Sequence, residues 1–333
     1  MDTIRRLLWR TGSRLGSLRH TARLVNSHAD AGDLNRAMAV AASKAAAGIP
    51  GANLLAADLL ADRIGNRKAA ENYYRAAVDE GDEEAFNNYG CFLSEDDDRA
   101  EEAEETFLRG ISTGDPLAME NLGKHYFDLG DDEAAAESLK KAVESGRNNA
   151  LSYLARAESR SGRAAPALAH ARMAAAHGVR SADLALAEAL ASDPAADPAE
   201  IDVAYRRAVA GSDEGAPFSY GRWLQDDGQL SEALSQYQDA ADQGEINAFL
   251  NMGNILSDLG DPTRAEEMYR LGREASDPES AAALAELLAS RERYSEATSA
   301  VVAAEALGLP PHRVTELQDL VTRARNHRPE LDE

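Results

Sequence analysis

The sequence predicts an all-α protein made of about nine stacked helical hairpins, with one more helix after the last. The main observation is a signature that returns every 32 to 34 residues: Ala, three residues, an aromatic or apolar residue, two residues, then Ala or Gly. A fixed period of this size is typical of a solenoid, whose units bury their apolar faces against their neighbours. The Ala column reads Ala37, Ala70, Ala103, Ala135, Ala167, Ile201, Ala233, Ala265 and Ala297.

Composition supports the helical class. Apolar residues make up 44% of the 333 residues, but aromatic residues only 5%, and alanine supplies much of the remainder. Small side chains suit closely packed helices, and few stretches show the alternation of β-branched residues that strands need.

One repeat unit, residues 117–146, shows how the hairpin arises. Leu122 and Tyr126 have helical spacing and define the apolar stripe of a first helix. A Gly-Asp pair then ends that helix and caps the next one. Ala135 and Leu139 form the inner stripe of the second helix. We therefore expect two antiparallel helices in each unit.

These residues resemble the tetratricopeptide repeat, through Leu-Gly-x-x-Tyr, Gly-Asp and Ala-x-x-x-Leu-x-x-Ala. The unit that closes with Ala76, Ala77, Gly81 and Asp82 is closer to the related Sel1-like repeat. The resemblance implies a right-handed α-solenoid. We expect a basic amphipathic segment or cap at 1–17, nine repeats in a single solenoid domain at 18–309, a capping helix at 310–327 and a tail at 328–333.

Two repeats depart from the pattern. Asp58 stands in a first-helix column that otherwise holds Gly, Ala or Val, and the leucines around it predict a shifted register in repeat two. Repeat six has a longer connection, 192–199, in which two prolines favour a turn.

The net charge of −23 is unevenly distributed. Residues 1–25 contain six arginines and one aspartate, a net of +5, so the rest carries −28. An acidic body repels phosphate backbones, which argues against nucleic-acid binding by the repeats. Residues 1–17 form either a cap or a basic amphipathic arm that contacts an anionic membrane, a nucleic acid or an acidic partner. The acidic run at 79–105 is a solvated face or a docking patch for a basic partner.

No motif indicates an enzyme, a cofactor or a metal site. Cys91 is the single cysteine, which excludes an internal disulfide and a cysteine-based zinc site. The histidines lack metal-ligand spacing, and each glycine-rich turn follows a helix instead of a strand. No apolar run is long enough to span a membrane. A reducing, cytoplasmic setting and a GC-rich bacterial genome fit this composition.

The resemblance implies that the first helices line a concave groove that binds a partner. Asn can pair with an extended peptide backbone, and Lys or Arg with a carboxylate or phosphate. The matching positions are Asn88, Asn121, Lys124, Tyr153, Arg156, Arg160, Phe218, Arg222, Asn251 and Asn254.

Three functions remain open. The first is an adaptor that binds an extended peptide or protein segment, with an anionic stretch, in this groove. The second is a regulatory or sensor subunit of a separately encoded enzyme. The third is a scaffold that assembles with itself. Alternatively, the groove asparagines pair with neighbouring repeats and the cations balance acidic helices.

Overall fold

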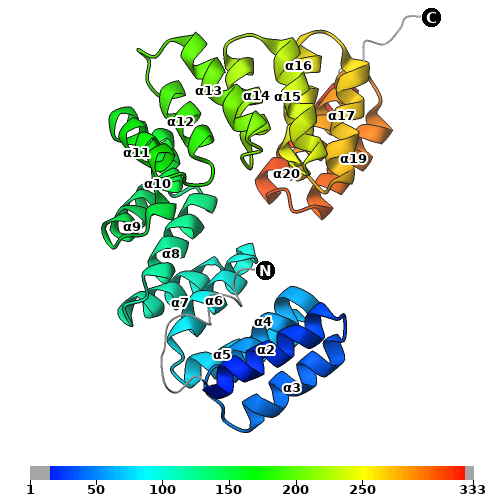
Figure 1. Ribbon diagram of the computed structural model, residues 1–333. Helices are drawn as coiled ribbons and strands as arrows, with labels where there is room; N and C mark the ends of the chain where they lie inside the picture. Colours follow the sequence, from blue (N-terminus) through cyan, green and yellow to red (C-terminus); the bar gives the residue numbers. More distant parts are fainter. Residues whose placement is uncertain (1–15, 327–333) are drawn as a thin grey trace, which may run out of the picture. The chain divides into compact units, whose positions relative to one another are not determined.

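The computed structural model describes residues 16–326, and all regular secondary structure in that range is helical (Figure 1). The chain divides into two compact units, 1–185 and 186–333. The predicted N-terminal arm, except for its last two residues, and the predicted tail lie outside the described range. The division into a single solenoid domain with these flanking segments stays a prediction.

The first unit contains five complete hairpins, each made of a first and a second helix. Repeat one pairs α2 with α3, and the next four repeats follow in order (Figure 1). Their bounds are α2 Gly16–Asp30, α3 Leu34–Ala46, α4 Ala52–Leu59, α5 Arg67–Asp79, α6 Glu83–Ser94, α7 Ala100–Ser112, α8 Pro116–Asp128, α9 Asp132–Glu144, α10 Leu151–Arg160 and α11 Ala164–Ala176.

The second unit begins within α12 and contains three further complete hairpins and the last helix. The bounds are α12 Ala182–Ala191, α13 Pro198–Ala210, α14 Ala216–Asp226, α15 Leu230–Asp242, α16 Asn247–Asp258, α17 Pro262–Glu274, α18 Pro278–Ser290, α19 Tyr294–Ala306 and α20 Pro311–Asn326. α20 packs on α18 and α19 through Val314, Leu317 and Val321, all buried.

Short acidic caps and left-handed glycines explain where the helices begin and end. Asp131, for example, accepts a hydrogen bond of 3.0 Å from the backbone N–H of Ala134 at the start of α9. Gly130, just before it, has φ of +80°, a conformation that costs glycine little. The connection therefore turns sharply, and the two helices of the hairpin lie against each other.

The repeated small residues permit the close approach of the two helices. A Cβ added to Gly90 would lie 2.6 Å from the ring of Phe107, and one added to Gly123 would lie 2.6 Å from Leu139. The second-helix Ala column, from Ala37 to Ala297, is buried throughout. The prediction of an all-α solenoid of about nine hairpins with a C-terminal cap helix is confirmed.

Repeat two departs from the others as its sequence indicates. All eight residues of α4 are buried, and a π-helical turn, η1 (Leu60–Ile64), follows directly. A π-helical turn fits one extra residue into a helix. This turn accommodates the shifted leucines, and Asp58, in the preceding helix, is buried against Tyr74.

Within each unit, several first helices of successive repeats adjoin one another. α8 lies beside both α6 and α10, and α16 lies beside α18, whereas the second helices among the described residues are spaced farther apart. The first helices therefore form the more closely spaced face of each stack. This is the face on which the predicted binding residues are carried.

Candidate functional site

Asparagine side chains on this face form a chain of hydrogen bonds that crosses three repeats. Asn121 Nδ2 donates to Asn87 Oδ1 (2.8 Å), and Asn87 Nδ2 donates to Asn88 Oδ1 (3.2 Å). Asn88 Nδ2 in turn lies 3.3 Å from both carboxylate oxygens of Asp58. These three amide groups thus donate in one direction, from Asn121 towards the carboxylate of Asp58. The predicted groove residues Asn88 and Asn121 thus serve contacts between repeats.

Asp58 is the acceptor at the end of this chain, and it is buried, with 3% of its surface exposed. Tyr74 donates a hydrogen bond of 2.9 Å to its Oδ1. Burial raises the pKa of Asp58 to about 7, although the hydrogen bonds from Tyr74 and Asn88 oppose the rise. The one acidic residue in the small-residue column therefore becomes a polar connection between repeats two and three.

Glu120 forms a second buried polar cluster, on α8. Its carboxylate accepts hydrogen bonds from Lys124 Nζ (2.7 Å) and Arg147 Nε (2.8 Å), and only 4% of its side chain is exposed. Burial acts to raise the pKa of Glu120, but the hydrogen bonds and charges of the two cations lower it below its ordinary value. One carboxylate thus holds two cations in place.

Cationic side chains next to this cluster lie over aromatic rings. Lys124 Nζ is 5.4 Å from the ring centre of Tyr153, and the guanidiniums of Arg156 and Arg160 are 5.0 and 4.4 Å from that of Phe127. The rings of Phe127 and Tyr153 meet edge to face at 5.4 Å. These side chains, from α8 and α10, form one cation–aromatic cluster, which we call the α8–α10 cluster.

Neighbouring carboxylates balance part of this charge. Arg160 Nε lies 3.0 Å from Asp132 Oδ1, and its NH1 lies 3.3 Å from the carbonyl oxygen of Phe127. Lys124, Tyr153 and Arg156 are half-buried, while Arg160 is exposed. The predicted residues of repeats four and five are therefore brought together, and they keep an accessible basic edge.

The predicted residues of the second unit are more dispersed. Phe218 is half-buried and packs on Tyr237 with ring centres 5.6 Å apart, which is a core contact. Arg222 and Asn254 are exposed, and Asn254 accepts a hydrogen bond of 2.8 Å from Tyr269. Asn251 is half-buried. These four residues do not form a cluster like that on α8 and α10.

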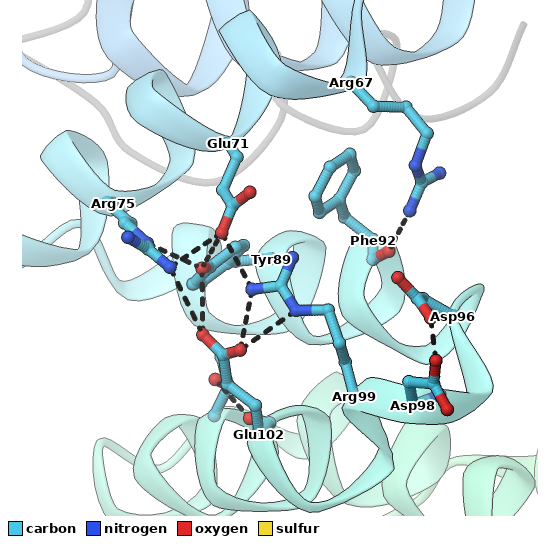
Figure 2. A network of polar contacts seen from close by, with 10 residues as sticks. Arg67, Glu71, Arg75, Tyr89, Phe92, Asp96, Asp98, Arg99 and Glu102 are labelled. Atoms are coloured by element: carbon cyan, nitrogen blue, oxygen red, sulfur yellow. Dashed lines mark hydrogen bonds and ion pairs between the residues drawn. The ribbon is translucent and has the colours of Figure 1, made fainter.

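A charged network of side chains from α5, α6 and the start of α7 links repeats two and three (Figure 2). Arg99 lies 2.7 Å from Glu71 and 2.6 Å from Glu102, and Arg75 lies 2.7 Å from the same oxygen of Glu71. Tyr89 OH is within 3.3 Å of both carboxylates. Of these carboxylates, Glu102 belongs to the acidic run at 79–105, and the structure pairs it with Arg99.

Repeats eight and nine carry the same network at the equivalent positions. Arg293 lies 2.6 Å from both Glu266 and Glu296, and Arg270 lies 2.7 Å from Glu266. Each residue occupies the same repeat column as its counterpart in Figure 2. The ion pairs thus follow the repeat, which marks them as part of the scaffold.

The family comparison agrees with this architecture. Residues 118–149 and 246–272 match the tetratricopeptide repeat model. The match covers repeat four and much of repeat eight. A search of curated proteins finds no match.

Solved structures of helical-repeat proteins are similar to the chain. A protective antigen of uropathogenic Escherichia coli with an SLR fold shares 19% identity, over 96% of this chain and 78% of that one, with a TM-score of 0.46. A tetratricopeptide repeat protein of Parabacteroides merdae shares 13%, over 81% and 97%, at 0.49. A chain of the APC/C hetero-tetramer Cut9–Hcn1 shares 12%, over 87% and 52%, at 0.50.

The stacked hairpins define an all-α repeat protein. Within that class, two segments of the chain match the tetratricopeptide repeat model, so the chain contains repeats of the tetratricopeptide type. This fold is typically a non-catalytic scaffold that mediates protein–protein interactions. None of the helices in residues 16–326 is both long and apolar enough to span a membrane.

Several residues of these polar clusters were not identified from the sequence. Asn87 and Glu120 fall two positions before the first-helix column, where helical periodicity assigns no groove role. Phe127 was also missed, although it is the ring on which two arginines stack. A search for Arg at i+4 spacing opposite an aromatic residue in the preceding repeat would have found it.

Proposed function

We propose that the chain is a non-catalytic adaptor and that the α8–α10 cluster binds an extended, anionic segment of a protein partner. The observation that carries the proposal is that three cations lie over two aromatic rings of successive first helices: Lys124 over Tyr153, and Arg156 and Arg160 stacked on Phe127. Stacking restricts long side chains before a ligand arrives, which lowers the entropic cost of binding.

Local charge supports an anionic ligand. Lys124, Arg147, Arg156 and Arg160 bring four positive charges close to the carboxylates of Glu120 and Asp132, in a body that is otherwise strongly acidic. A local excess of positive charge attracts carboxylates and suppresses binding of basic segments. The side-chain amides of Asn88 and Asn121 already donate to residues of neighbouring repeats. We therefore assign recognition of the partner segment to the cations and aromatic rings instead of to a ladder of asparagines.

The test is a comparison of partners captured from an extract of the source organism. Full-length protein, the variant Lys124→Ala/Arg156→Ala and the control Lys141→Ala/Arg172→Ala are immobilised, and captured proteins are identified by mass spectrometry. The control removes two cations from the exposed surfaces of α9 and α11 in the same two repeats. Arg147 still pairs with buried Glu120 in the test variant, so the fold is expected to persist.

We expect a partner that the wild type and the control retain and the test variant loses. Overlapping peptides from that partner should then locate binding in an acidic, extended segment. Equal capture by the test variant, or binding that maps to a basic or folded region, would reject the proposed site. Circular dichroism of all three proteins checks that helicity is unchanged.

Observations favour the adaptor over self-assembly through the C-terminal end. α20 covers the last hairpin with the buried side chains of Val314, Leu317 and Val321. A solenoid that stacks through its last repeat would need that apolar face for a second copy. The regulatory-subunit alternative uses the same surface and differs only in the identity of the partner.

A further inference from the structure

A second recognition point emerges when two aromatic stacks of the same chain are compared. In repeats two and three, Tyr74, Tyr89 and Phe92 stack with ring centres 5.1 to 6.2 Å apart. In repeats six and seven, equivalent positions hold a second stack with ring centres 5.3 to 6.1 Å apart. Its members are Tyr205, Tyr220 and Trp223.

In the first stack, an arginine of the same chain lies over one face of the Phe92 ring. The Arg67 guanidinium lies 4.2 Å from the ring centre of Phe92, and its NH2 donates a 2.9 Å hydrogen bond to the Phe92 carbonyl oxygen (Figure 2). The same guanidinium forms an ion pair with Glu95. Phe92, under this cover, is only 5% exposed. Ring, carbonyl and carboxylate together form a receptor for one arginine.

The second stack retains the ring and the carboxylate of this receptor, but its arginine contact, from Arg206, is with the Tyr220 ring at 5.7 Å and not with Trp223. The position equivalent to Arg67 is Pro198, the first residue of α13. Trp223 replaces Phe92 and is half-buried, and Asp226, at the position of Glu95, is exposed. Within residues 16–326, no lysine or arginine lies over the Trp223 ring, whereas five other aromatic rings carry six such contacts.

We propose that Trp223 and Asp226 bind an arginine side chain of a protein partner, which takes the place that Arg67 occupies in repeat three. An indole is the strongest cation–π acceptor among side chains, and a carboxylate beside it adds a charge-assisted hydrogen bond. The Trp223 carbonyl already accepts from Asp227 N (3.0 Å), so recognition relies on the ring and the carboxylate. This inference is independent of the α8–α10 cluster, which prefers anions.

Arginine fits this site better than lysine for a geometric reason. A planar guanidinium can stack on the indole and still direct an N–H group towards the carboxylate, as Arg67 does on Phe92 and Glu95. An ammonium is a compact charge that cannot stack. The site should therefore discriminate between the two cations, which a merely acidic surface does not.

The experiment uses the full chain and two phage-displayed peptide libraries, one with arginine and one with lysine fixed at the centre of otherwise random residues. Panning is done at about 0.15 M salt to screen non-specific attraction to the acidic body. Selected peptides are then measured against Trp223→Ala, Asp226→Asn, Pro198→Arg and the control Asp258→Asn. Asp258 is exposed at the position equivalent to Asp226 in the next repeat.

We expect arginine peptides to bind, and Trp223→Ala to weaken them about tenfold. Asp226→Asn should weaken them less, and Asp258→Asn should have no effect. Pro198→Arg should abolish binding because the new arginine fills the site from within the chain. This variant keeps Trp223, so it separates occupancy from misfolding. An empty arginine selection, equal binding of lysine peptides, or peptides that are indifferent to Pro198→Arg would overturn the proposal.

Discussion

Tyr74 donates a 2.9 Å hydrogen bond to the buried carboxylate of Asp58. This pair connects the two helices of repeat two at a position where the other repeats place a small apolar residue or Gly. The carboxylate also receives the chain of hydrogen bonds that begins at Asn121. An acidic residue in a packing column thereby forms a polar link across three repeats, and its charge state should affect stability.

Asp58→Asn is expected to reduce the pH dependence of unfolding. Because the folded pKa of Asp58 is about 7, above that of an exposed Asp, the folded state binds this proton more tightly. The extra stability is present below the unfolded pKa and is lost as pH rises towards 7, by at most about 4 kcal/mol. Urea unfolding at about pH 5 and about pH 8 should show a smaller difference for the variant than for the wild type.

Asp98→Asn is the control for this comparison, because Asp98 is exposed. It should retain the wild-type dependence on pH. If Asp58→Asn and the wild type lose the same stability between the two conditions, Asp58 does not titrate in this range.

Glu120→Ala should strongly destabilise repeats four and five. The change leaves Lys124 and Arg147 without their buried partner, and breaking such a pair typically costs about 3–5 kcal/mol. Since the pKa of Glu120 is lowered on folding, its contribution is present above the unfolded pKa and is lost as pH falls through the folded one. Urea midpoints of the variant and wild type should therefore converge in acid.

The control for this prediction is Glu137→Ala. Glu137 pairs with Lys141 on the exposed surface of α9, so its removal should leave the midpoint nearly unchanged. A Glu120→Ala protein as stable as the Glu137→Ala protein would show that the buried cluster contributes little.

Much of the fold could be predicted from the sequence, because the repeat columns report packing within one hairpin. The Ala column, the glycines of the first helices and the Asp caps all serve contacts between residues close in the chain. Contacts between repeats depend on how each hairpin rotates against the next. Adjacent residues such as Asn87 and Asn88 point differently on a helix, yet the rotation between repeats joins both to one chain of hydrogen bonds.

The candidate site could be predicted only in part, for the same reason. Spacing identified Lys124, Arg156 and Arg160 as an unusual group of cations, and they do lie close to shared rings. It could not show that Glu120 holds Lys124 or that Asp132 holds Arg160, because those distances follow from side-chain packing. The binding role of the group stays a prediction.

Gly253→Ala is expected to destabilise repeat eight through overpacking. A Cβ there would lie 2.3 Å from Cε1 of Tyr269, whereas one at Gly221 would lie 3.0 Å from Tyr237. Overpacking of this kind typically costs about 1–3 kcal/mol, so Gly253→Ala should lower the urea midpoint more than Gly221→Ala. Adding Tyr269→Leu should recover part of the loss. If the second change lowers stability further by its full separate cost, the ring is not the source of the clash.

The charged network of Figure 2 should couple repeats two and three measurably. Arg99 and Glu71 are about one-fifth exposed, at 23% and 22%, so solvent screens their interaction only in part. A double-mutant cycle with Arg99→Met and Glu71→Gln should give a favourable coupling of up to about 1 kcal/mol that weakens in high salt. The hydrogen bonds from Arg99 lower the pKa of Glu71, so the coupling should also fall as pH drops through that pKa.

The equivalent cycle on Arg293 and Glu266 should have the same sign, because both networks occupy the same columns. Zero coupling in both cycles would mean that the repeated ion pairs set register between hairpins without stabilising them.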